Sequence, residues 1–186
     1  MPVPIRRLVV ALSLCCALLA GATACGSGGT TQDTAAVVAA ATPTPTTSAE
    51  KQKFAKTRFV VNAGLAAGAT YQWIVKPWKA GKFKKGAKGR RLALVKAGLA
   101  GAFTYNRLKA ATKNAQGDPT LAKAVAPLAA GIDALKDLPS KLRKGDSTDA
   151  VVGSFDDIIN DVKDAGKSAG AEVTDQVPSA SQLTGG

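Results

Sequence analysis

The side chains available for chemistry in this 186-residue chain are limited, because it has no histidine and only three cysteines. Without histidine, the Ser-His and Cys-His pairs that activate a nucleophile cannot form, and neither can histidine-ligated metal sites. Cys15 and Cys16 lie in an apolar stretch near the N-terminus, and only Cys25 follows it. We therefore expect no disulfide, no metal site and no cofactor in the folded part of the chain.

Two short patterns could suggest catalysis, but neither has the surroundings that catalysis needs. Ser48-Ala49-Glu50-Lys51 matches the pattern S-x-x-K, yet it falls in a stretch with nothing to position a nucleophile. Asp157, Asp161 and Asp164 share one face of an expected helix with Asp156 beside them, but a hard cation needs ligands from several elements. We expect no catalytic residue, and a protein that is not an enzyme.

The strongest candidate for a binding site is the basic stretch at residues 76–91, KPWKAGKFKKGAKGRR. Its cations attract anions over a long range, and the aromatic side chains between them can stack or lie at an interface. Pro77 is expected to stop the preceding helix, and the glycines to keep the stretch mobile. The pattern predicts binding to an anionic polymer or to lipid headgroups. The candidate residues are Lys76, Trp78, Lys79, Lys82, Phe83, Lys84, Lys85, Lys88, Arg90 and Arg91.

The charge of the chain is segregated along the sequence. Residues 51–117 hold 16 basic residues and no acidic one, whereas residues 118–186 hold 7 basic and 11 acidic residues. An interpretation of the basic stretch that involves no ligand is therefore also open. Its cations could face the aspartates of the last helix or form a solvated loop, and Trp78 and Phe83 could fold back to close the bundle.

Residues 1–24 have the features of an export signal. Arg6 and Arg7 precede an apolar run over residues 8–19, which small residues follow. A permanent transmembrane helix needs about 20 apolar residues, so this run favours a secretory signal peptide. Because an exported protein rarely meets nucleic acid, we expect none to be bound.

The segment Ala22-Thr23-Ala24-Cys25 resembles the lipobox of bacterial lipoproteins, although that family prefers leucine where Ala22 stands. The resemblance implies that Cys25 is acylated and becomes the new N-terminus, which would place the protein on the outer face of the cell membrane. With its Ala-rich, Cys-poor composition, the chain is similar to uncharacterised lipoproteins of high-GC Gram-positive bacteria. Ordinary cleavage after Ala24 would instead give a freely secreted protein.

After Cys25 the chain divides into three further parts. Residues 25–53 are rich in Gly, Thr, Pro and Ala and indicate a flexible tether. Residues 54–175 carry the apolar periodicity of helices, and residues 176–186 are expected to form a flexible tail.

The helical part predicts an all-α fold, a small antiparallel bundle of about four helices. The first two expected helices, at residues 57–75 and 90–113, resemble each other at a shift of 34 positions, which lays Thr70 on Thr104. Their glycines, such as Gly64, Gly68 and Gly98, predict close approach of neighbouring backbones. A third helix should start at Asp118-Pro119 and be kinked by Pro127, and Pro139 should end it or start a new turn. A fourth helix should start near Ser147.

Together these features predict a membrane-anchored lipoprotein on the outside of the cell. Its basic stretch would bind anionic wall polymer or phospholipid headgroups. The alternative is a secreted or anchored helical domain for protein interaction or scaffolding, without polyanion binding.

Overall fold

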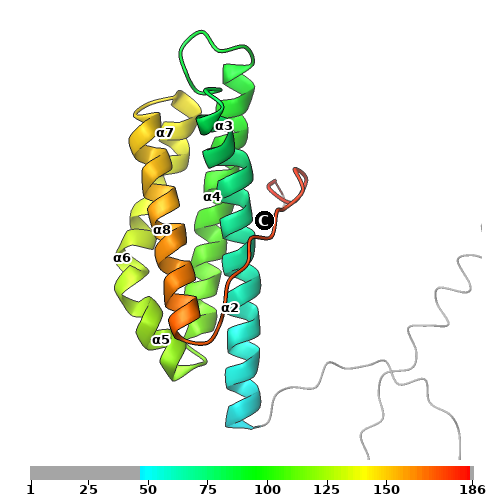
Figure 1. Cartoon of the computed structure of the whole chain (residues 1–186), viewed down its shortest axis with the longest axis vertical. Helices are drawn as coiled ribbons and strands as arrows, with labels where there is room; N and C mark the ends of the chain where they lie inside the picture. Colours follow the sequence, from blue (N-terminus) through cyan, green and yellow to red (C-terminus); the bar gives the residue numbers. More distant parts are fainter. Residues whose placement is uncertain (1–46, 185–186) are drawn as a thin grey trace, which may run out of the picture. The chain divides into compact units, whose positions relative to one another are not determined.

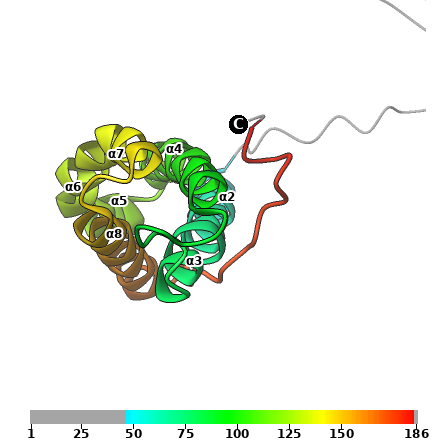
Figure 2. The same ribbon diagram turned by 90° about the horizontal axis from the view of Figure 1, so that it is seen from above.

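The structure is a computed structural model, and it describes residues 47–184. The expected signal peptide and Cys25 lie outside the described residues. Within residues 47–184 the chain forms helices and turns and no β-strand. The helices form four antiparallel columns (Figures 1 and 2), which confirms the predicted all-α bundle.

The first column begins earlier than the sequence predicts. It consists of α2 (Ser48–Thr70), a π-helical turn (Tyr71–Val75) and α3 (Lys76–Lys79). Thr47 and Glu50 form a capping box, in which each side chain accepts a hydrogen bond from the backbone N–H of the other residue. This reciprocal pair satisfies two N–H groups that would otherwise lack acceptors, so the helix starts at Ser48, within the expected tether, rather than at residue 57.

Pro77 does not stop this column, and the expectation that it would is wrong. The helix continues to Lys79 because the π-helical turn precedes the proline, with the N–H of Lys76 donating to the carbonyl of Tyr71. A proline inside a regular helix clashes with the carbonyl four residues before it. The wider π turn changes the register at this point and lets the chain pass the proline.

The second column is α4 (Arg90–Ala115), which runs antiparallel to α2 and packs along it (Figure 1). The hydroxyl oxygens of Thr70 and Thr104 lie 3.1 Å apart in this interface, and both residues are buried. Thr104 Oγ1 also lies 3.4 Å from the carbonyl of Ala66, to which it can donate. Thr70 and Thr104, which are equivalent at a shift of 34 positions, thus meet in the interface of the antiparallel pair.

The third column is broken where its prolines predict. Asp118 caps it by accepting a hydrogen bond of 2.8 Å from the N–H of Leu121, and short 3₁₀ turns occur at Pro127 and just before Pro139. The loss of an N–H at each proline breaks the α-helical hydrogen bonding and produces the bends. Its segments are α5 (Pro119–Val125), α6 (Ala129–Ala134) and α7 (Leu138–Lys144).

The fourth column is α8 (Thr148–Ser168), which buries Phe155 and Ile159 toward the other three. Ser147 precedes it, as expected, but its side chain makes no capping hydrogen bond and its φ is +46°. The preceding Gly145, with a φ of +76°, ends α7 in the left-handed region that glycine adopts without strain.

The C-terminal segment differs from the flexible tail that we expected from residue 176. Residues 171–184 lie beside α2 (Figures 1 and 2), where the N–H of Gln176 donates to the carbonyl of Gly64 at 2.9 Å. Pro178 is fully buried. A Cβ at Gly68 would lie 2.1 Å from the carbonyl oxygen of Gln176, so only glycine allows this approach. Gly64 and Gly68 of α2 therefore accommodate an extended segment rather than another helix.

Candidate polyanion site at the basic end of the bundle

The ten predicted binding residues all lie at one end of the bundle, where α3 is joined to α4 (Figure 1). The loop of residues 80–89 meets the C-terminal end of α7 and the first turn of α8 there. We call this region, residues 76–91 with Lys96, the basic end.

Two of the ten residues hold the basic end together. The Phe83 side chain is only 4% exposed and belongs to the hydrophobic core. Arg90 Nε donates a hydrogen bond of 2.9 Å to the carbonyl of Phe83, and the same guanidinium lies against Gly145. Phe83 therefore closes the bundle, as one of the two interpretations of this residue predicts, and Arg90 fixes the loop to the start of α4.

Trp78 links the basic end to α8. Its indole N–H donates to the Asp149 carboxylate, and its side chain is 36% exposed. Asp149 therefore accepts a hydrogen bond from a neutral donor rather than forming an ion pair with a lysine. The sequence did not identify Asp149, because nothing local connects it with a residue 71 positions earlier.

Residues 80–89, which carry Lys82, Lys84, Lys85 and Lys88, form a series of tight turns. The N–H of Lys82 donates to the carbonyl of Pro77, and that of Lys84 to the carbonyl of Gly81. Gly81, Gly86 and Gly89 all have a positive φ, so the glycines shape these turns. The lysine side chains of residues 76–91 are exposed.

None of the ion pairs within residues 47–184 involves a cation of residues 76–91. Those that form use Lys56, Lys109 and Lys163. Within the described residues, the aspartates of α8 therefore form no ion pair with the basic stretch, contrary to the alternative in which they neutralise it. Eight cations are gathered at one end without a carboxylate at ion-pair distance.

The basic end contains two hollows. The α3–α8 hollow has a volume of about 560 Å³ and includes the carboxylate-bearing Asp149. The α3–α4 hollow has a volume of about 430 Å³ and has no acidic residue in its lining. The first is lined by Trp78, Lys79, Phe83, Lys84, Lys85, Arg90, Gly145, Thr148 and Asp149. The second is lined by Gln72, Trp73, Lys76, Pro77, Ala80, Lys82, Lys88, Gly89, Leu92, Ala93 and Lys96. Arg91 is exposed and lines neither.

The α3–α4 hollow includes two residues that the sequence analysis missed, Trp73 and Lys96. The Lys96 ammonium lies 5.7 Å from the centroid of the Trp73 ring, a cation–π contact. Among the described residues, the indole nitrogen of Trp73 is the buried side-chain polar atom without a hydrogen-bond partner. The sequence did not identify Trp73 as a site residue, because a tryptophan within an expected helix is ordinarily a core residue.

Residues 47–184 carry neither a metal-type cluster of side chains nor a membrane-spanning helix. In this range no group of acidic or sulfur side chains is placed to hold a metal ion. No helix there has the length and apolar character needed to cross a bilayer. The pKa of Lys109 is raised by a hydrogen bond from its ammonium to Asp133 and by the charge of that carboxylate, but this pair lies on α4 and α6, away from the basic end.

Comparison with protein-family models, with curated proteins and with solved structures found no significant match.

Proposed function

We propose that the chain is a non-enzymatic lipoprotein on the outer face of the cell membrane, anchored through acylated Cys25. Its basic end binds anionic envelope polymer or phospholipid headgroups. The anchor is inferred from the signal-like residues 1–24 and from the lipobox-like segment that ends at Cys25. Two acyl chains on this cysteine would give durable membrane attachment.

The observation that carries the binding proposal is the absence, within residues 47–184, of ion pairs to the cations of the basic stretch. Cations that stabilise a fold usually lie against carboxylates or carbonyls, and here only Arg90 does so. The lysines instead project from one ordered loop, where their potentials add. A surface of this kind attracts polyanions, with an affinity that falls as salt screens the charges.

Binding to anionic liposomes and to cell-wall fragments tests this proposal. Replacing Lys82, Lys84, Lys85 and Lys88 with glutamine removes four exposed positive charges. Each lysine near an anionic surface contributes about 1 kcal/mol, so we expect affinity to fall on the order of 10³-fold at low salt. The matched control replaces four exposed lysines elsewhere, Lys113, Lys123, Lys136 and Lys167, and should bind nearly as the unmodified chain does.

The outcomes separate the candidate functions. An equal loss in both variants would mean that net charge rather than the basic end governs binding. Unchanged binding in both would contradict the proposal and favour the protein-interaction alternative. Intact-mass measurement of membrane-extracted protein tests the anchor: we expect an acylated chain that starts at Cys25, and a Cys25→Ser variant should not be acylated.

A further inference from the structure

We propose that the α3–α4 hollow is a site for one anionic phospholipid molecule. The headgroup phosphate would lie among the lysines, and the glycerol and first acyl carbons would lie on the apolar floor. This inference rests on the proposed function, since it names the ligand and the place within the basic end.

The lining of the hollow has two chemically distinct parts. Four lysines surround it, Lys76, Lys82, Lys88 and Lys96, with no carboxylate among the lining residues. Its apolar lining, which we call the floor, consists of Trp73, Pro77, Ala80, Leu92 and Ala93. A volume of about 430 Å³ is within the range of small-molecule sites. By contrast, the α3–α8 hollow contains Asp149, which would repel a phosphate.

Exposed apolar side chains continue the floor along α4. Leu92 is 60% exposed, and Val95, one turn further along the helix, is 46% exposed. An acyl chain that left the hollow along this path would cover both. A hydrophilic wall polymer would gain nothing from them, so the apolar continuation favours a lipid.

Trp73 provides an independent reason to expect a ligand. Its indole N–H has no acceptor among the described residues. A buried donor without an acceptor is unfavourable and calls for an explanation, and a ligand that supplies the acceptor is one. The ester and phosphate oxygens of a phospholipid are acceptors of this kind, and the tryptophan ring suits the boundary between headgroup and acyl chain.

The proposed anchor is compatible with this site. Cys25 is 22 residues before Thr47, a span of at most about 75 Å when extended. The helical run Ser48–Lys79 is about 48 Å long and ends at the basic end. A bundle held through Cys25 could therefore bring the hollow to the membrane that anchors it.

The test uses dihexanoyl phosphatidylglycerol at concentrations where it stays monomeric. The protein is the processed full chain carrying Trp78→Phe, which leaves Trp73 as the only tryptophan. We expect saturable binding that shifts the Trp73 fluorescence. Dihexanoyl phosphatidylcholine should bind at least about tenfold more weakly, because its headgroup has no net charge, and inorganic phosphate should bind without the shift.

Three sets of lysine replacements locate the site, each removing three positive charges. Glutamine at Lys76, Lys82 and Lys88 should weaken lipid binding at least about tenfold. Glutamine at Lys79, Lys84 and Lys85, in the other hollow, should have a several-fold smaller effect. The control set at Lys113, Lys123 and Lys136 should bind as the unmodified chain does. Leu92→Ser should lower lipid affinity about threefold to fivefold and leave phosphate binding unchanged.

Each result decides between the inference and the proposal on which it rests. If the two sets at the basic end weaken binding equally and Leu92→Ser has no effect, the hollow is not a lipid site, although the basic end still binds anions. If wall fragments bind tightly and the short-chain lipid does not bind, the ligand is a polymer and the inference is wrong. If none of these anions binds, the proposed function itself fails.

Discussion

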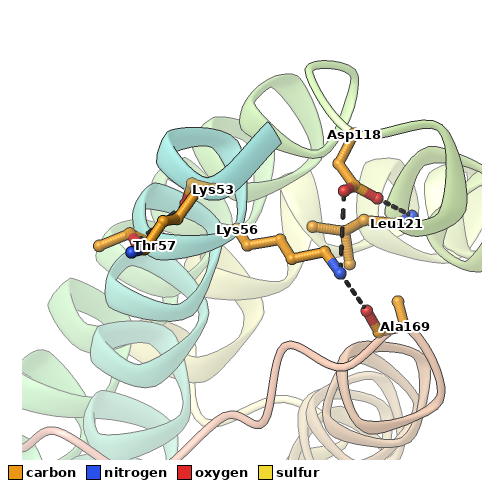
Figure 3. A network of polar contacts seen from close by, with 6 residues as sticks. All are labelled: Lys53, Lys56, Thr57, Asp118, Leu121 and Ala169. Carbon is orange, nitrogen blue, oxygen red and sulfur yellow. Dashed lines mark hydrogen bonds and ion pairs between the residues drawn. The ribbon is translucent and has the colours of Figure 1, made fainter. Parts of the chain in front are cut away.

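The two ends of the bundle use charge in opposite ways. At the basic end the cations lack ion-pair partners among the described residues, and the structure is held by the apolar Phe83 and by Arg90 on a backbone carbonyl. At the other end the charges bind the columns to each other (Figure 3). Among the described residues, the charge that connects the columns is thus paired and partly buried, whereas the charge of the basic end is exposed and has no ion-pair partner.

The paired end is organised around Asp118. This residue is only 4% exposed, and it caps α5 through the N–H of Leu121. Lys56 of α2 approaches the same carboxylate at 3.8 Å and donates to the carbonyl of Ala169, at the end of α8, at 2.8 Å (Figure 3). One carboxylate and one ammonium therefore connect three of the four columns.

The largest effect that the comparison predicts is at Phe83. Phe83→Ala removes a buried aromatic ring that closes the basic end, so the free energy of unfolding should fall by about 3 kcal/mol. Chemical denaturation measures this change. Leu92→Ala at the same end is the control, because Leu92 is mostly exposed and should cost less than about 0.5 kcal/mol. Equal losses would mean that Phe83 does not close the bundle.

The next largest effect should come from the paired end. Asp118→Ala removes a helix cap and leaves Lys56 without its carboxylate, so we expect a loss of about 2 kcal/mol in the free energy of unfolding. Lys56→Met keeps the apolar stem and the cap and should lose about 1 kcal/mol. A loss below about 0.5 kcal/mol for Asp118→Ala would contradict the structural role given to this charge.

Removing lysines at the basic end should not destabilise the fold. Glutamine at Lys82, Lys84 and Lys88 removes repulsion between exposed cations, so the free energy of unfolding should stay the same or rise by about 0.5 kcal/mol at low salt. Thermal unfolding at low and high salt checks this, and the gain should disappear at high salt. A loss of 1 kcal/mol or more would show that these lysines are structural, and the contrast between the ends would fail.

Local chemistry explains which parts of the fold the sequence predicted. The start of the third column at Asp118-Pro119 and its breaks at Pro127 and Pro139 depend on a few neighbouring residues, and these predictions are confirmed. The passage of the first column through Pro77 depends on a π turn, for which sequence gives no simple rule. Gly64 and Gly68 predicted the close approach of a neighbouring backbone, but not that this neighbour would be an extended segment rather than a helix.

The candidate site was predictable in the same uneven way. Its cations are contiguous in sequence, so their clustering needed no knowledge of the fold. Which of the ten turn inward was not predictable, because the burial of Phe83 and the contacts of Arg90 depend on α7 and the core. Trp73, Lys96 and Asp149 joined the site only through packing between helices.

The smallest effect concerns Lys109 and Asp133, an exposed pair that belongs to neither end. Their ammonium and carboxylate lie 2.8 Å apart, and Asp133 raises the pKa of Lys109 above its usual 10.5. A raised pKa in the folded state means that the pair stabilises the fold below pH 10.5, and that this contribution is lost as the pH rises through the higher folded pKa. Thermal unfolding of Asp133→Asn against the unmodified chain isolates this contribution, since the two chains differ only in that carboxylate. The difference in stability between the two chains should be small at neutral pH, as for other exposed pairs, and should vanish in strong alkali.

Two outcomes would contradict this account. A difference in stability that grew with pH would have the wrong sign for a raised lysine pKa. A loss at neutral pH as large as that of Asp118→Ala would show that burial is not what makes the charges of the paired end stabilising.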